Sequence, residues 1–437
     1  MSNGAAAGYR LLPVTQVGGS VQVPGDKSIS HRALMLGGIA HGATRISGFL
    51  DSADCRATLE ALRTLGVQIE RPGAGEVLIT GAGFRGLRGS SAPLDMGNAG
   101  TAMRLFMGLL AGQPFDSTLV GDESLMRRPM ERVATPLRLM GAQLDTQDGH
   151  PPVRIHGGAA LRAIDYTLPM ASAQVKSAIL LAALRAHGHT RVSEPAPTRD
   201  HTERMLQGFG VQLERSGATV AMRGGQTLRG TAVNVPGDIS SAAFFIVAGC
   251  LAAPAGLTLR GVGVNPTRTG LIDMLRLMGA QIDIRPQHGA GPEPIADITV
   301  HAAPLHGVVL PEHLVPLAID ELPVFFIAAA CATGETVVTG AAELRVKESD
   351  RLAAMASGLK AVGVQCELLP DGIRIQGGGL RGGRVNSHGD HRVAMAFAIA
   401  SVRAGSDIEI DDVANVGTSF PGFPAAARAI GLQLHEL

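Results

Sequence analysis

The sequence predicts a mixed α/β protein built from six copies of one module, arranged as two lobes of three copies each. Two internal repeats carry this prediction. A phrase of the form Leu-x-x-x-Gly-x-Gln-x occurs six times, once in degenerate form, and Val-Pro-Gly-Asp occurs at 23–26 and again at 235–238. With 437 residues, 45% of them hydrophobic, the chain is also long enough for two or three domains.

Each copy of the repeated phrase is centred on a glycine. The six glycines are Gly66, Gly141, Gly210, Gly279, Gly363 and Gly431. A glycine that adopts the left-handed conformation commonly ends a helix, and the alternating residues that follow it here are typical of a strand. We therefore expect every module to contain an amphipathic helix, a glycine cap and a strand.

A second helix is expected at the start of each module. Six segments are rich in small residues and apolar nearly all round, which is typical of buried helices. They span 28–40, 99–111, 172–184, 240–252, 322–332 and 391–402. A short strand-like run follows each of them, so the module alternates helices and strands.

The doubled Val-Pro-Gly-Asp predicts where the lobes begin and end. We expect an N-terminal lobe at 24–235 and a C-terminal lobe made of 1–23 and 236–437, because the strand-like segment before residue 23 is expected to pair with the other lobe. The two crossovers would form a hinge. A cleft between two lobes is a usual place for a ligand site.

Composition excludes several classes of function. The 38 Lys and Arg residues are balanced by 38 Asp and Glu, so the basic excess of nucleic-acid or membrane-surface binders is missing. The apolar stretch 242–257 is shorter than the roughly 20 residues that span a bilayer, and residues 1–9 do not resemble a signal peptide. The four cysteines form no C-x-x-C pair, which indicates reduced thiols. We expect a cytoplasmic protein without nucleic-acid or membrane partners.

Candidate chemistry collects where the buried helices begin. Residues able to cap these helices are Asp26 and Ser28, Asn98 and Thr101, Ser172, Asp238 and Ser240, Asp320, and Asp390. Simple capping explains Asp238 and Ser240. Elsewhere cations such as Lys27, Arg32 and Arg392 stand beside the caps, and Arg104 lies inside the second helix. A helix N-terminus with a nearby cation favours an anion. Several such sites suggest a substrate with several phosphates or carboxylates.

Three charged segments are further candidates, and for the first two an exposed surface is the alternative explanation. Arg127 and Arg128 share a loop, and we expect one of them to be solvated. Segment 345–351 carries five charges in seven residues, and a bound anion would relieve its repulsion. Asp320 and Glu321 interrupt an apolar stretch, where a carboxylate costs free energy unless it is partnered or used. No segment carries the ligand pattern of a metal site.

Four motifs together resemble one enzyme family over essentially the whole chain. They are PGDKSISHR (24–32), GNAGTAMR (97–104), RVKESDR (345–351) and DHRVAM (390–395). They resemble EPSP synthases, the 3-phosphoshikimate 1-carboxyvinyltransferases, and PMASAQVKSA (169–178) and TRDHTE (198–203) resemble the class II variant. The resemblance implies the two-lobed enolpyruvyl transferase fold, with three βαβαββ modules per lobe that close on substrate by induced fit.

The resemblance also implies a reaction. The 5-hydroxyl of shikimate 3-phosphate attacks C2 of phosphoenolpyruvate while C3 is protonated, and the tetrahedral intermediate then loses phosphate. The implied protein is a monomer that uses no metal or organic cofactor. A base, an acid and a cationic clamp around a dianion make this chemistry coherent.

Residue roles follow from the matched positions. Lys27, Asp320 and Glu348 are implied as catalytic residues: a proton shuttle that touches both substrates, a base at the 5-hydroxyl, and an acid for C3. The residues implied at shikimate 3-phosphate are Lys27, Ser28, Arg32, Ser172, Gln174, Arg199, Asp320 and Lys347. Those implied at phosphoenolpyruvate are Lys27, Gly100, Arg128, Gln174, Arg351 and Arg392.

One departure and two alternatives accompany this interpretation. Many family members carry a lysine before a Thr-Phe-Pro near the C-terminus, where this chain has Thr418. The UDP-N-acetylglucosamine enolpyruvyl transferase of the same fold uses a loop cysteine, but the corresponding loop, 121–133, has none. A non-catalytic repeat scaffold would also fit six copies, yet it has no reason to place Lys27 and Asp320 at individual helix starts.

Overall fold

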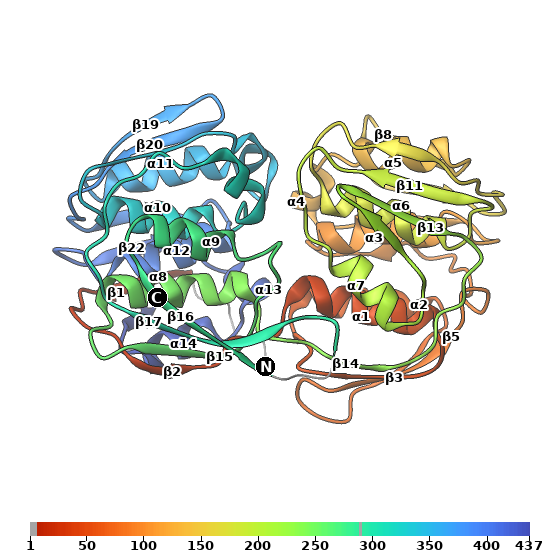
Figure 1. Ribbon diagram of the computed structural model, residues 1–437, viewed down its shortest axis with the longest axis horizontal. Coiled ribbons are helices and arrows are strands. Elements are labelled where there is room, and N and C mark those ends of the chain that lie inside the picture. Colours follow the sequence, from red (N-terminus) through yellow and green to blue (C-terminus); the bar gives the residue numbers. More distant parts are fainter. Residues whose placement is uncertain (1–6, 288–290) are drawn as a thin grey trace. The chain divides into compact units, whose positions relative to one another are not determined.

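The computed structural model describes residues 7–287 and 291–437, which divide into two compact units (Figure 1). Unit 1 takes the described residues of Met1–Pro24, Pro236–Gly289 and Pro294–Leu437. Unit 2 takes those of Gly25–Val235 and Ala290–Glu293. The short stretch that ends at Glu293 thus groups with unit 2, although the strands on either side of it belong to unit 1.

The module is seen most simply in the middle of unit 2. Its elements are β6 (Leu94–Asp95), α3 (Gly100–Leu110), β7 (Ser117–Val120), α5 (Glu131–Leu139), β8 (Gln143–Gln147) and β9 (His150–His156). Strand β6 is parallel to β7, while β9 is antiparallel to both β7 and β8, which gives the sheet order β6-β7-β9-β8. This is a βαβαββ unit, with α4 (Glu123–Met126) as an added turn.

The other two modules of unit 2 repeat this plan. The first contains α1 (Lys27–Ile39), β3 (His41–Ser47), α2 (Ala53–Thr64), β4 (Gln68–Glu70) and β5 (Val77–Ala82). The third contains β10 (Asp165–Thr167), α6 (Ala173–Ala183), β11 (His189–Ser193), α7 (His201–Gly208), β12 (Glu214–Ser216) and β13 (Thr219–Arg223). The parallel edge strand of the first module is β14 (Ala232–Asn234), which pairs with β3 although it is the last strand of unit 2 in the sequence.

Unit 1 also contains three modules. The first contains β2 (Gly19–Val21), α8 (Ile239–Ala252), β15 (Leu257–Gly263), α9 (Gly270–Leu277), β16 (Gln281–Gln287) and β17 (Ile295–His301). The second contains η1 (Glu312–Leu317), α10 (Leu322–Cys331), β18 (Glu335–Val338), η2 (Ala342–Val346), α11 (Arg351–Ala361), β19 (Gln365–Leu369) and β20 (Gly372–Gln376). The third contains β21 (Gly383–Asn386), α12 (His391–Ala400), β22 (Ile408–Asp411), α13 (Val416–Ser419), α14 (Phe423–Ala429) and β23 (Gln433–Glu436), and β1 (Gly8–Leu12) completes it.

The N-terminal segment belongs to unit 1 through strand pairing. Strand β2 runs parallel to β15, and β1 lies between β22 and β23. The six sheets of the described residues contain four strands each, except for β18-β20-β19. In that module the edge strand is reduced to isolated bridges such as Val309 with Val337.

All six glycines of the repeated phrase end helices in the left-handed conformation. Their φ values run from +85° at Gly363 to +106° at Gly431. In the first copy, the Gly66 N–H donates to the carbonyl of Arg63 and the Val67 N–H to that of Leu62. The same two hydrogen bonds recur in the other five copies. This is the Schellman motif, so the predicted caps are confirmed.

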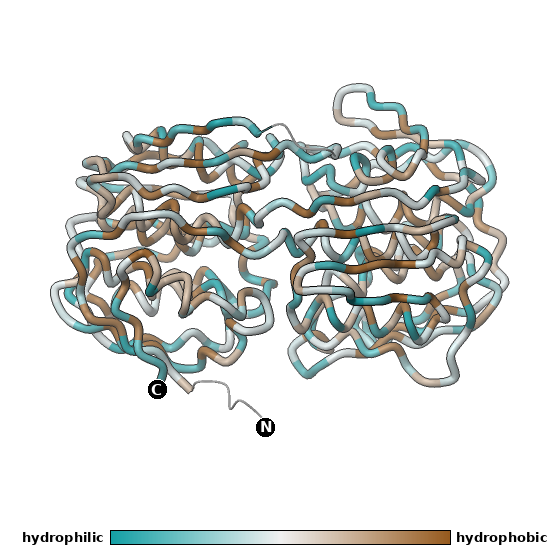
Figure 2. The backbone as a smooth tube through the Cα atoms, turned by 90° about the horizontal axis from the view of Figure 1, so that it is seen from below, coloured by the Kyte–Doolittle hydropathy of each residue, from teal (hydrophilic) through white to brown (hydrophobic). Residues whose placement is uncertain are grey.

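The six predicted apolar helices are also confirmed, as α1, α3 and α6 in unit 2 and α8, α10 and α12 in unit 1. Each unit has its own hydrophobic core around them. Hydrophobic and hydrophilic residues are interspersed along the chain (Figure 2). In β17 buried residues alternate with partly exposed ones, so one face of its sheet packs on the core. None of the helices within residues 7–287 and 291–437 combines the length and apolar character that a membrane span requires.

Two of the predicted helix caps are wrong. Asp26, Ser172, Asp238 and Asp390 accept a backbone N–H as N-caps. Helix α3 instead begins after Ala99, and α10 begins after Glu321, neither with a side-chain cap. The predicted caps Asn98 and Asp320 face arginine side chains instead.

Candidate active site

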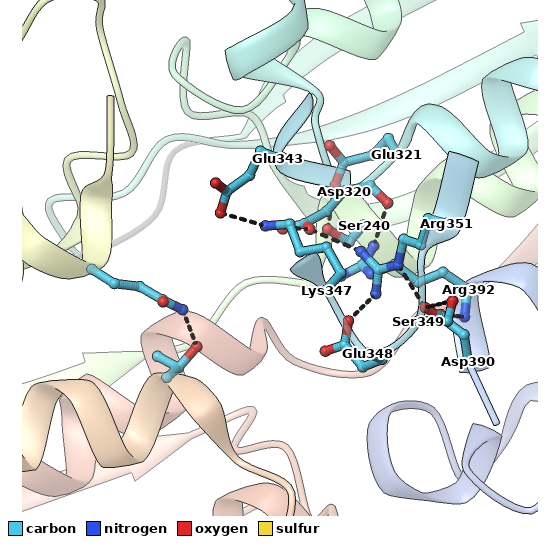
Figure 3. A network of polar contacts seen from close by, with 12 residues as sticks. Ser240, Asp320, Glu321, Glu343, Lys347, Glu348, Ser349, Arg351, Asp390 and Arg392 are labelled. Atoms are coloured by element: carbon cyan, nitrogen blue, oxygen red, sulfur yellow. Dashed lines mark hydrogen bonds and ion pairs between the residues drawn. The ribbon is translucent and has the colours of Figure 1, made fainter. Parts of the chain in front are cut away.

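In unit 1, charged side chains gather around Arg351, at the start of α11 (Figure 3). Its Nε donates to Asp390 Oδ2 at 2.8 Å and its Nη1 to Asp320 Oδ1 at 3.2 Å, while Nη2 donates to Glu348. Burial alone would lower the pKa of Arg351, but Asp390, Glu348 and Asp320 together raise it above its ordinary value. The guanidinium is therefore a fixed positive charge.

Lys347 adds a second cation beside the same carboxylate. Its Nζ lies 3.6 Å from Asp320 Oδ1 and 3.5 Å from Glu343 Oε1. The side chain of Lys347 is 22% exposed and that of Asp320 14%, whereas Arg351 is 1% exposed. A solute can therefore reach Lys347 and Asp320, as it can the more exposed Glu343, whereas Arg351 is buried and contacts Asp320 from inside unit 1.

The start of α12 completes the cluster. Asp390 caps this helix by accepting the Arg392 N–H, and its other oxygen accepts from Ser349 at 3.1 Å as well as from Arg351. The Arg392 side chain donates from Nη1 to the backbone oxygen of Asp320 at 2.9 Å. The structure therefore brings together five predicted residues from three segments of unit 1: Asp320, Lys347, Glu348, Arg351 and Arg392.

The charges of this cluster nearly balance. Lys347, Arg351 and Arg392 stand against Asp320, Glu343, Glu348 and Asp390 (Figure 3). The repulsion that we expected a bound anion to relieve in segment 345–351 is thus already reduced by these carboxylates. Its cations are neutralised by carboxylates within unit 1, because a buried guanidinium is costly unless it is paired.

In unit 2, Arg32 lies where α1, α6 and α7 meet. Its Nε donates to Thr202 Oγ1 at 2.6 Å, its Nη2 to Ser177 Oγ at 2.9 Å, and its Nη1 to the Ser28 carbonyl at 2.9 Å. Burial lowers the pKa of Arg32 to about 10, which leaves it charged at neutral pH, and Arg199 acts on this pKa in the same direction. Ser28, Arg32 and Arg199 therefore share one neighbourhood.

The start of α3 combines a helix N-terminus with two guanidinium groups. A Cβ built on Gly100 would lie 3.0 Å from Arg128 Nη1 and 3.3 Å from Arg104 Nη1. Arg128 donates from Nη2 to Asn98 Oδ1 at 2.7 Å. The missing side chain of Gly100 leaves room for both arginines at the helix start, an arrangement that favours an anion.

Gln174 is joined to this helix from α6. Its Oε1 accepts from Arg104 Nη1 at 2.7 Å, and its Nε2 donates to Thr101 Oγ1 at 2.9 Å. Ser172 caps α6 by accepting the Val175 N–H. The predicted residues Gln174, Gly100 and Arg128 therefore surround one helix start.

Lys27 follows the Asp26 cap of α1, and its Nζ is 2.9 Å from Asp54 Oδ2. The pairing with Asp54 was not predicted, because nothing in the residues around Asp54 marks it. The same holds for Thr202 and Ser177 around Arg32. Arg104, by contrast, is one of the cations that the sequence associates with the helix starts, and it lies beside Gln174 and Gly100.

Of the two loop arginines, Arg128 is buried, whereas the side chain of Arg127 is 67% exposed and pairs with Glu123. The expectation that one of the two is solvated is confirmed. In the part of the chain that the structure describes, no three His, Cys, Asp or Glu side chains are grouped as metal ligands would be.

Comparison with known proteins points to one family. The EPSP synthase (3-phosphoshikimate 1-carboxyvinyltransferase) family matches residues 12–426. The 3-phosphoshikimate 1-carboxyvinyltransferase of Acidithiobacillus ferrooxidans is 59% identical over 426 residues, 98% of each chain. That of Methylococcus capsulatus is 57% identical over 97% of each chain.

Solved structures give the same result for the fold. The EPSP synthase of Acinetobacter baumannii superposes with a TM-score of 0.88 at 52% identity, covering 98% of this chain and 99% of the other. The enolpyruvyl transferase NikO of Streptomyces tendae has a TM-score of 0.80 at 18% identity over 99% of each chain, which shows the fold alone. The predicted enolpyruvyl transferase fold is confirmed, and the chain belongs to the EPSP synthase family.

Proposed function

We propose that this enzyme transfers the enolpyruvyl (carboxyvinyl) group of phosphoenolpyruvate to the 5-hydroxyl of shikimate 3-phosphate, with release of phosphate. The reaction belongs to the shikimate pathway of aromatic amino-acid (chorismate) biosynthesis. The observation that carries the proposal is the full-length identity of 59% to a 3-phosphoshikimate 1-carboxyvinyltransferase. The geometry of Asp320, Lys347 and Arg351 adds a physical reason, because it joins a reachable carboxylate to cations.

Asp320 is the proposed base. Its carboxylate is partly exposed and is held by Lys347 and Arg351, so it can accept the proton of the 5-hydroxyl as the oxygen attacks C2. C3 gains a proton in this step and loses one when phosphate leaves, which restores the carbon–carbon double bond. Lys27 and Glu348 are the proposed proton carriers at C3.

The anionic groups of the substrates would meet the cations of both units. We assign phosphoenolpyruvate to the start of α3 at Gly100, to Arg128 and Gln174, and to Arg351 and Arg392, with Lys27 reaching both substrates. Guanidinium groups bind phosphate and carboxylate through paired hydrogen bonds. The proposed ligands of shikimate 3-phosphate are Lys27, Ser28, Arg32, Ser172, Gln174, Arg199, Asp320 and Lys347.

A phosphate-release assay tests the function. Protein with both substrates should release phosphate and form the enol ether, detected by mass spectrometry, whereas each substrate alone should release none. Replacing shikimate 3-phosphate by UDP-N-acetylglucosamine tests the other enolpyruvyl transferase activity, and no product is expected. Product from the sugar nucleotide, or none from shikimate 3-phosphate, would contradict the proposal.

The proposed enzyme works as a cytoplasmic monomer and closes on its substrates. If residues of both units bind the same two substrates, ligands should lower the radius of gyration, because contacts available only in a closed state shift the equilibrium toward it. Small-angle scattering with shikimate 3-phosphate and an inert phosphoenolpyruvate mimic measures this change. An unchanged radius at saturation, with binding confirmed by calorimetry, would rule out closure.

A further inference from the structure

Glu321 follows Asp320 in the sequence, and its side chain is completely buried. One of its oxygens, Oε1, accepts a hydrogen bond from the Ser240 hydroxyl and lies 3.4 Å from Arg268 Nη2 (Figure 3 shows Ser240 and Glu321). The other, Oε2, has no hydrogen-bond partner among the described residues. A buried carboxylate satisfied on one side is expensive, and the apolar start of α10 offers no packing reason for it.

The contacts of Glu321 join the starts of two helices. Ser240 lies in the first turn of α8, and its hydroxyl also accepts from Arg268 Nη2 at 2.6 Å. Glu321 is the residue that precedes α10. The carboxylate therefore ties the start of α10 to the start of α8, two helices that pack directly on each other.

Asp320 lies in the same turn, one residue earlier. The turn closes when the N–H groups of Glu321 and Leu322 both donate to the Ala318 carbonyl. On its other side, the Asp320 carbonyl is held by Arg392 from α12. The backbone that carries the Asp320 carboxylate is thus anchored by α8 through Glu321 and by α12 through Arg392.

We infer that Glu321 is a positioning residue, which acts through Asp320 by holding its carboxylate where the 5-hydroxyl must be deprotonated. This inference rests on the proposed function. Weakening the hold of Glu321 on Arg268 or on Ser240 would loosen the turn before α10 and let Asp320 shift against Lys347 and Arg351. A misplacement of about 1 Å can lower a rate on the order of 100-fold, so the effect should appear in kcat.

The test compares Glu321→Gln, Asp320→Ala and the double variant with the wild type, using phosphate release. Glutamine keeps the shape of the side chain but removes its charge opposite Arg268. We expect Glu321→Gln to lower kcat about 10- to 100-fold with little change in the KM for shikimate 3-phosphate. In the Asp320→Ala background the same substitution should have almost no further effect, because it acts through Asp320.

The matched control is Glu335→Gln, the same chemical change in an exposed ion pair with Arg374 in unit 1, which should retain wild-type kcat. If Glu321→Gln does not fold, as judged by circular dichroism and melting temperature, Ser240→Ala removes the hydroxyl contact and should show the same dependence on Asp320. A folded Glu321→Gln protein with wild-type kcat, or equal rate losses with and without Asp320, would overturn the inference. A wild type that releases no phosphate with both substrates would instead refute the proposed function itself.

Discussion

His31, next to Arg32 in the first motif, should make the stability of the protein depend on pH. It is buried in α1 with Nδ1 2.7 Å from Thr58 Oγ1, and Nε2 has no hydrogen-bond partner among the described residues. Burial lowers the pKa of His31 from 6.5 to about 4, and the charges of Lys27 and Arg32 act in the same direction, against Asp54. The folded chain therefore keeps a neutral imidazole where the unfolded chain is already protonated.

The sign and size of the effect follow from these two pKa values. Between pH 6.5 and pH 4 the unfolded chain binds more protons at His31, so the free energy of unfolding falls as the pH falls through this window. Each pH unit inside the window is worth about 1.4 kcal/mol. From pH 7.5 to pH 5.0 the loss attributable to His31 is about 2 kcal/mol.

Urea unfolding of the wild type and His31→Asn at both pH values measures this loss. Asparagine cannot titrate but keeps a polar group near Thr58, and any cost of its smaller size is the same at both pH values and cancels. We expect the wild type to lose about 2 kcal/mol more than the variant on acidification. His156→Asn, which removes an exposed histidine 2.9 Å from Asp145, should behave like the wild type. Equal pH dependence of the wild type and His31→Asn would refute the reasoning.

Three further predictions concern catalysis, thiols and the repeated fold. Lys27→Ala, Asp320→Ala and Glu348→Gln should each lower kcat by on the order of 100-fold or more with unchanged circular dichroism; normal turnover in any one of them removes that residue from the mechanism. A thiol alkylator should not abolish activity quickly, since burial raises the pKa of Cys250 and Cys331 to about 12 and leaves roughly one such thiol in 10⁴ ionised at pH 8. EDTA should not abolish activity either, because the described residues include no group of metal ligands; rapid loss with EDTA that a divalent ion reverses would contradict this. Gly210→Ala should lower the free energy of unfolding by about 1–2 kcal/mol in urea titrations, because φ is +88° there although a Cβ would have open space; unchanged stability would show that the left-handed cap is not required.

Features that depend on neighbouring residues were predicted well from the sequence. A helix that ends on a left-handed glycine involves only a few consecutive residues, so the phrase around Gly66 predicts the same cap wherever it recurs. Buried helices such as α8 are apolar all round and need no partner to be recognised. The edge strand β14 was not predicted, because its pairing with β3 joins residues almost 190 positions apart, as Ala232 with Arg45 shows.

The candidate site was predicted as a set of residues but not as a set of contacts. Segment 345–351 was singled out by its charge density, and the structure places its Lys347, Glu348 and Arg351 around Asp320. The expectation that a bound anion relieves its repulsion left out the pairing of Arg351 with Asp320 and Asp390, which lie 31 and 39 residues away in the sequence. The prediction that Asp320 caps α10 was wrong for a similar reason. Its carboxylate accepts from Arg351, which belongs to another segment, and the helix begins one residue later, after Glu321. Local patterns identify which side chains are available, and tertiary pairing decides how they are used.

Residues that all six modules share determine the fold, whereas residues that differ between modules determine the candidate site. Positions common to the six modules, above all the capping glycines, specify the helices and sheets. The doubled Val-Pro-Gly-Asp shows how the site departs from this pattern. Lys27 and Arg32 follow its first copy, whereas Ile239 and Phe244 occupy the equivalent places after the second and are buried in the core of unit 1. The modules therefore supply equivalent helix starts, and the charged chemistry depends on the residues in which the copies differ.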